Sequence, residues 1–314
     1  MRKRLQKRNW GIAVLWSLLM VLLYNPIALA EENTVDRTYL RDVYKTMASV
    51  RSVHYDITAK GDSPKGDLQL AASGDLQGNP LKFKQDLSFL YHDLLNKETR
   101  FEVKQCGEAD QENLVVYMLQ GDKWLKKTVP VGTALSKAPT EAERTAAQEE
   151  MMQYLKLVKT TRETPSYKTL EITLDAMKLS DAMEVAMQQQ AQKLVDPKQG
   201  EELKKAAALM RIGLLAAGDI KYTVKVDKAT KMIKEIEMDL TGPIRKGASL
   251  FLNLAPAKDR EEMNDFIQKS TLNLQVTYSK FNQTGPVDVP QEAKDTAREI
   301  EVKGKEALAK PAVK

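Results

Sequence analysis

The chain has 314 residues, enough for one large domain or two small ones, and 29% of its residues are charged. It contains 48 Lys and Arg against 43 Asp and Glu, but its first 30 residues carry five basic residues and no acidic one, so the remainder is formally neutral. This balance gives no sign of the basic excess of a nucleic-acid-binding protein, and a single cysteine, Cys106, excludes an internal disulfide.

The first 30 residues predict a cleavable signal peptide. Basic residues precede an apolar run from Trp10 to Tyr24, and Ala28-Leu-Ala30 has the small-x-small pattern that signal peptidase recognises. An uncleaved membrane anchor is the alternative, but it needs about 20 apolar residues, and Asn25-Pro26 interrupts the run earlier. No cysteine near this site offers a point for lipid attachment. We therefore expect cleavage after Ala30 and export to the periplasm, the cell surface or the medium.

A helix and three strands are predicted at the start of the mature chain. Apolar residues recur at three- and four-residue spacing from about residue 35 to residue 50, after Asn33 or Thr34 as the cap. Between residues 50 and 91, apolar residues alternate with polar ones in three runs that are separated by turns rich in Gly, Pro, Asn and Asp. This pattern is typical of an antiparallel meander with one apolar face, on which the helix would pack.

The middle of the chain combines further strands with a long helical insert. Strands are predicted at residues 98–106 and 114–119, and the second turns at Gly121 into a hairpin whose Trp124 would pack over the sheet rim. Good helix formers from residue 138 to residue 159 predict a helix, and alternation returns from 167 to 176. The insert, residues 178–218, would hold two helices that are separated at Asp196-Pro197.

The last third returns to strands. A hairpin is predicted from residue 220 to residue 240, then an apolar loop from Ile244 to Pro256, a short helix from 259 to 269 and a strand from 272 to 278. A charged segment then leaves the domain as a frayed helix. The predicted organisation is thus a signal peptide (1–30), a single domain (31–285) with its insert, and a C-terminal tail (286–314).

These elements predict an α+β fold. In about eight or nine strands, every second residue is apolar, so these strands share one apolar face. A sheet of that size must curl and bury this face. The available cover is the helical insert together with the apolar loop around Leu250–Leu254, and this arrangement leaves room for a cavity.

Three parts of the sequence resemble the LolA/LppX-like family of exported bacterial lipid carriers. They are the helix-to-strand passage Tyr44–Tyr55, the hairpin Tyr222–Ile233 with its Asp-Lys turn, and Val287–Glu292 after the closing strand. The resemblance implies a curved antiparallel half-barrel with helices across its concave face, a hydrophobic cavity for acyl chains and no catalytic residues. Two features depart from the family: the chain lacks the N-terminal Cys of lipid-anchored relatives, and the insert at 178–218 is long.

The sequence offers few residues for catalysis or metal binding. His54, His92 and Cys106 are its only His and Cys residues, and a Cys-His pair would need hydrogen-bond contact, which nothing in the sequence supports. His92-Asp93 falls short of a three- or four-ligand metal site. The sequence contains no calcium loop, phosphate loop or nucleophile elbow. We therefore expect no enzyme activity, no metal and no cofactor.

The function expected from these patterns is a non-enzymatic carrier or sensor of a lipid or other hydrophobic ligand. Methionines concentrate in the predicted covering helices, and Met surfaces accept varied apolar partners. An envelope protein and transient membrane contact are further expected partners, and nucleic acid is not. The alternatives are a structural or interaction module of the cell envelope without a ligand cavity and, if His54 met Cys106 or a Ser in a cleft, a secreted hydrolase. The residues expected to line the cavity are Tyr55, Ile57, Leu70, Phe83, Leu87, Phe89, Phe101, Tyr222, Val224 and Met238, with Leu250 and Phe251 at a mobile lip.

Overall fold

The structure, a computed structural model, describes residues 35–300. The described range omits residues 79, 96, 111–112, 131–142, 144–145, 147–148, 150–151, 194–196, 253–255 and 257–258. The predicted signal peptide, the cap at Asn33 or Thr34 and the end of the predicted tail lie outside the described residues.

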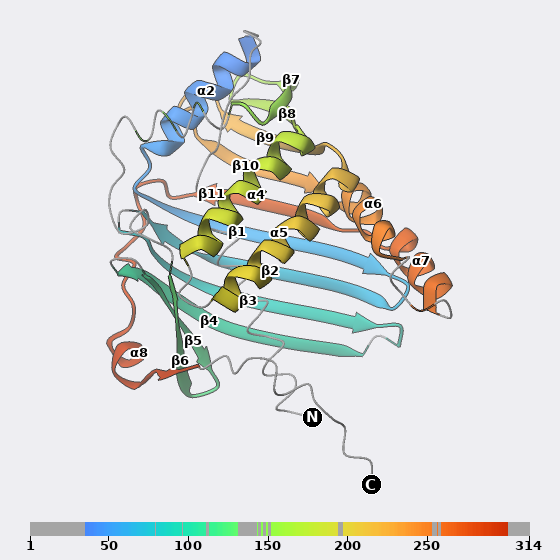
Figure 1. Cartoon of the computed structure of the whole chain (residues 1–314). Coiled ribbons are helices and arrows are strands. Elements are labelled where there is room, and N and C mark those ends of the chain that lie inside the picture. The colour runs from blue at the N-terminus through green and yellow to red at the C-terminus, as the bar shows by residue number, and fades with distance from the viewer. Residues whose placement is uncertain are drawn as a thin grey trace.

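Twelve strands form one curved sheet, in the order β12-β6-β5-β4-β3-β2-β1-β11-β10-β9-β8-β7 (Figure 1). Neighbouring strands are antiparallel, except that β12 pairs with β6 in parallel. The strands are β1 (Ser52–Ser63), β2 (Gly66–Gln77), β3 (Lys82–Asp93), β4 (Glu98–Asp110), β5 (Asn113–Gln120), β6 (Lys123–Pro130), β7 (Leu155–Glu163), β8 (Tyr167–Leu174), β9 (Ile220–Asp227), β10 (Ile233–Asp239), β11 (Asn273–Ser279) and β12 (Arg298–Glu299). The α+β class is as predicted, whereas the prediction of eight or nine strands is wrong.

One missed strand, β7, takes the place of the last part of the helix predicted from residue 138 to residue 159. Residues 143, 146 and 149 are helical as predicted, and the other residues of that helix up to 151 lie outside the described residues. The pairing of β7 with β8 shifts register between Leu155 and Leu157, as expected of a β-bulge. The extra residue places buried Leu155 and Val158 three positions apart, and this spacing imitates the periodicity of a helix. The other missed strand, β12, is only two residues long.

Helix α2 (Val35–Ala48) closes one part of the apolar face of the sheet. Its buried Leu40, Val43 and Tyr44 form a cluster with buried residues of β7–β10, and the hydroxyl oxygens of Tyr44 and Tyr222 lie 3.3 Å apart. A second cluster, centred on β1–β3, includes Tyr55 and Ile57. Both clusters use the alternate residues that the sequence marks as apolar, which confirms the predicted two-faced sheet for these strands.

The remaining long helices belong to two connections that leave the sheet at one end of the strands. Helices α4 (Ala176–Lys193) and α5 (Pro197–Ala217) connect β8 to β9, while α6 (Thr241–Phe251) and α7 (Arg260–Lys269) connect β10 to β11. Because these strands are antiparallel neighbours, both connections leave the sheet at the same end. Helices α4 and α5 lie side by side and cross the sheet on the side that carries α2 (Figure 1).

Helix α6 replaces most of the apolar loop predicted from Ile244 to Pro256. Pro243 lies in its first turn, where proline is tolerated, and the backbone N–H of Thr241 donates to Asp239 Oδ1 at 2.9 Å. The prediction of a loop is therefore wrong for Leu250 and Phe251, which belong to a helix rather than to a mobile lip, and residues 253–254 of the predicted lip lie outside the described residues.

Residues 286–299 do not leave the domain as a frayed tail. Val289 and Ala293, the latter in the short helix α8 (Gln291–Thr296), are buried in a cluster with Cys106, Tyr117 and Trp124. Ion pairs further fix this segment to the sheet, namely Lys82–Asp288 at 2.7 Å and Lys294–Glu108 at 2.6 Å. Apolar residues between the charges, Val289 and Ala293, hold the segment in place.

This packing predicts that Cys106 reacts slowly with thiol reagents. Burial raises the pKa of the Cys106 thiol to about 12. Because the thiolate is the nucleophile, we expect labelling at pH 8 to be at least about a hundredfold slower than for a free cysteine. Ala293→Asp should accelerate labelling by loosening the segment, and the exposed control Asp295→Ala should not. Rapid labelling of the unaltered protein, measured with a chromogenic disulfide, would contradict this packing.

Candidate functional site

The twelve predicted lining residues divide into core residues and incompletely covered ones. Tyr55 and Ile57 are 1% exposed, Val224 is fully buried, and Phe83 and Tyr222 are also buried, so these five belong to the core. Leu250 is exposed on α6, and Phe251 is the last residue of that helix. The half-buried members are Leu70, Leu87, Phe89, Phe101 and Met238.

Four of these half-buried residues lie in one row across the sheet. The register places Met238 opposite Leu274, Leu274 opposite Ala59, and Ala59 opposite Leu70. The register then places Leu70 opposite Phe89, and Phe89 opposite Phe101. We call this row, from β10 to β4, the apolar strip; its residues are Met238, Leu274, Ala59, Leu70, Phe89 and Phe101.

The apolar strip is less buried than the row beside it. The next row on the same face, two residues further from the helices, is fully covered at its centre, where Val276, Ile57 and Ala72 are at most 2% exposed, whereas Ile236 and Leu87 toward its ends are half-buried. In the apolar strip only Ala59 is buried. The apolar face is therefore sealed over β11, β1 and β2 in the middle of these strands and less covered toward the end where the helices leave.

Helices α4–α7 do not close this end of the apolar face by core packing. None of their described residues belongs to the buried clusters that the sheet forms with α2 and α8. Several apolar side chains of these helices are instead exposed, including Met177 and Val185 of α4 and Met210 of α5. The apolar strip and the α4–α5 helix pair thus leave apolar side chains exposed or half-buried at the same end of the fold.

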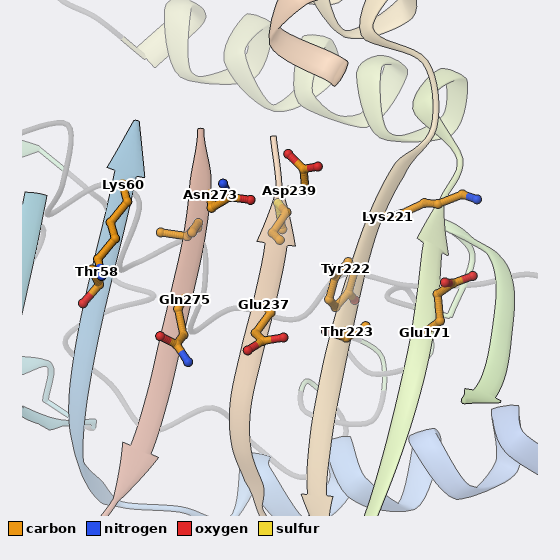
Figure 2. A pocket seen from close by; sticks show the side chains of 12 residues that line it. Thr58, Lys60, Glu171, Lys221, Tyr222, Thr223, Glu237, Asp239, Asn273 and Gln275 are labelled. Atoms are coloured by element: carbon orange, nitrogen blue, oxygen red, sulfur yellow. The ribbon is translucent and has the colours of Figure 1, made fainter. Parts of the chain in front are cut away.

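The polar face of the sheet carries a cleft of about 500 Å³ near the same strand ends (Figure 2). One row of its lining follows the strand register through Thr58, Gln275, Glu237, Thr223 and Glu171. Closer to the helices lie Lys60, Asn273, Asp239 and Lys221. Met238, Leu274 and Tyr222 complete the lining, so Met238 and Tyr222 are the two predicted lining residues that reach this cleft.

The cleft combines two ammonium groups and three carboxylates with amides and hydroxyls. Hydrogen bonds from Thr241 hold the pKa of Asp239 below its usual value. Lys60 and Lys221 form no ion pair with any residue in the described ranges. The ammonium, carboxylate, amide and hydroxyl groups of this lining can all make polar contacts with a ligand.

The two candidate groups of a Cys-His pair lie far apart. His54 Nδ1 lies 2.8 Å from Asp75 Oδ1, and the register then passes from Asp75 through Lys84 to Cys106. Three strand spacings separate His54 from Cys106, a distance of about 14 Å. This separation contradicts the hydrolase alternative built on that pair. Within the described ranges, no group of three or more His, Cys, Asp or Glu is arranged to hold a metal ion.

Sequence comparison identifies the family. Residues 44–298 match a family described as a family of unknown function, DUF6612. The chain belongs to the DUF6612 family. No curated protein matches this DUF6612 chain significantly. Among its described helices, none is both long and apolar enough to cross a membrane.

Two solved mycobacterial structures are similar to the DUF6612 chain. The lipoprotein LppX of Mycobacterium tuberculosis aligns with a TM-score of 0.38 and 12% identity, over 82% of this chain and 100% of LppX. LprF from Mycobacterium bovis aligns with a TM-score of 0.36 and 11% identity, over 81% of this chain and 96% of LprF. Scores this low carry no argument about ligand or function.

Proposed function

We propose that this DUF6612 protein is an exported, non-enzymatic carrier or sensor that binds a lipid or other hydrophobic ligand. The ligand would lie between the apolar strip and the α4–α5 helix pair. The observation that supports this proposal is the incomplete burial of the apolar strip beneath helices that take no part in the buried clusters. An apolar chain in this position would cover both sets of side chains at once.

Apolar burial alone would give this site useful affinity, without a specific polar contact. Burial of ten methylene groups would contribute about 8 kcal/mol, from which the costs of association and of ordering the chain are subtracted. The exposed methionine on α4, Met177, and the one on α5, Met210, suit such a site because a flexible thioether side chain adapts to varied apolar shapes. The expected selectivity is therefore for chain length and apolar area.

Fluorescent fatty acid uptake tests the proposal. We expect the unaltered protein to enhance the fluorescence of an environment-sensitive fatty acid and an unlabelled fatty acid to displace it. Leu70→Ser with Phe89→Ser should weaken uptake at least about tenfold, because both lose apolar area in the apolar strip.

A matched control separates loss of binding from loss of folding. Ser88→Asp with Ala71→Ser alters the neighbouring residues of the same strands, whose side chains point to the polar face, and should leave uptake unchanged. Circular dichroism would check that all variants keep their strand content. Equal uptake by both double variants would place the ligand elsewhere, and no uptake by the unaltered protein would favour a structural or interaction module.

A further inference from the structure

Helices α5 and α6 expose apolar side chains that the proposed ligand site does not account for. On α5, Leu209 is 53% exposed, Ile212 is 50% exposed and Leu215 is 41% exposed, and these residues follow one another at three-residue spacing. On α6, Leu250 is 46% exposed. Contiguous apolar surface of this kind on a protein otherwise rich in charge marks a contact site.

The two helices form one surface because their backbones approach closely. A Cβ atom added at Gly247 of α6 would lie 3.3 Å from the backbone oxygen of Gly213 on α5. No side chain therefore separates the helices at this point. The exposed residues of α5 and α6 are consequently close enough to meet one partner together.

This surface is cationic, although the chain after residue 30 is formally neutral. Helices α5 and α6 together contain six Lys and Arg and only two Glu; of these cations, Lys204 pairs with Glu201, and Arg211 pairs with Asp181 and Glu184 of α4. Exposed Lys205 lies one turn before Leu209, and exposed Lys246 lies one turn before Leu250. Neither lysine forms an ion pair within the described part of the chain. Their charge thus remains available to a partner.

We infer that α5 and α6 dock on an anionic lipid surface. We call the contact residues the docking surface: Lys205, Leu209, Ile212, Leu215, Lys246 and Leu250. Helices that combine exposed Leu and Ile with a basic surplus bind at the boundary between lipid headgroups and acyl chains, where apolar burial and attraction to anionic lipid act together. This inference does not rest on the proposed ligand site.

Vesicle flotation with the full chain tests the inference. We expect the protein to float with vesicles of phosphatidylglycerol, to float at least about tenfold less with phosphatidylcholine, and to be released as salt rises because surface charge is screened. Lys205→Glu with Lys246→Glu should reduce binding to phosphatidylglycerol at least about tenfold. Leu209→Ser with Leu215→Ser should reduce it comparably, because it removes the apolar part of the contact.

The matched control moves the same charge change to the sheet. Lys104→Glu with Lys159→Glu alters two exposed lysines of β4 and β7 and should leave vesicle binding intact. Equal binding to both lipids, no binding to either, or equal loss in the two lysine double variants would overturn the inference. A dimer in solution would also overturn the inference if the protein did not bind vesicles and Leu209→Ser with Leu215→Ser abolished the dimer. The surface would then bind a second copy of the chain. Vesicle binding without fatty acid uptake would reject the proposed ligand site and leave this inference standing.

Discussion

Replacement of Leu40 by alanine is expected to lower the free energy of unfolding by about 2–5 kcal/mol. Leu40 is fully buried where α2 meets β7–β10, in the cluster that also contains Tyr44 and Tyr222. The substitution removes apolar area and leaves a cavity between helix and sheet. Urea denaturation followed by circular dichroism would measure the loss.

The control for Leu40 lies on the same helix. Val35 is 83% exposed, so Val35→Ala should change the free energy of unfolding by less than about 0.5 kcal/mol. If Leu40→Ala were as mild as Val35→Ala, α2 would not be part of the core, and the placement of the helix on the apolar face would be wrong.

Replacement of Asp36 by asparagine is expected to lower the free energy of unfolding by about 2–3 kcal/mol. Asp36 Oδ1 accepts hydrogen bonds from Lys168 Nζ at 2.8 Å and from Thr160 Oγ1 at 2.6 Å. Lys168 is 8% exposed, and its ammonium group also lies 4.6 Å from the centre of the Tyr39 ring. Asparagine keeps the shape but leaves this buried ammonium without its counter-charge. The expected loss is below that of a fully buried pair because a quarter of the Asp36 side chain meets solvent.

The same site gives a pH dependence with a definite sign. Burial by itself raises the pKa of Asp36, but the hydrogen bonds from Lys168 and Thr160 outweigh it and lower the pKa below the usual value. The carboxylate therefore stabilises the fold above the unfolded-state pKa of about 4, and this contribution is lost as pH falls through the folded-state pKa. Asp36→Asn should flatten this part of the stability profile.

Urea midpoints between pH 3 and pH 6 would measure the effect. The control Asp42→Asn breaks an exposed ion pair with Lys231, worth at most about 1 kcal/mol, and should follow the unaltered protein. Parallel profiles for the unaltered protein and Asp36→Asn would show that Asp36 makes no such contribution.

The alternation of apolar and polar residues along a strand predicts which face of the sheet a residue occupies, but not how deeply that residue is buried. Ile57 and Leu70 both lie on the apolar face as predicted, yet Ile57 is 1% exposed and Leu70 is half-buried. The difference arises from position along the strand, because Leu70 lies nearer the end from which the helices leave. Alternation in one strand carries no information about the element that crosses above it.

Two further limits of prediction have different causes, one local and one long-range. The bulge at Leu155–Leu157 breaks strict alternation, so good helix formers around it suggested a helix where β7 forms. The polar cleft could not be anticipated, because Thr58, Lys221 and Glu171 come from distant parts of the sequence and meet only through strand order. The paired helices α4 and α5, in contrast, follow from strong local composition and a break at Pro197, and were predicted.

The central claim is that the helices above the apolar strip leave space that a hydrophobic molecule occupies. Native mass spectrometry of the protein purified from exporting cells measures this occupancy directly. The account predicts a folded species that is heavier than the polypeptide by the mass of one lipid and returns to the polypeptide mass after displacement by added fatty acid. A folded protein with the bare polypeptide mass alone, which remains unchanged when fatty acid is added, would contradict it.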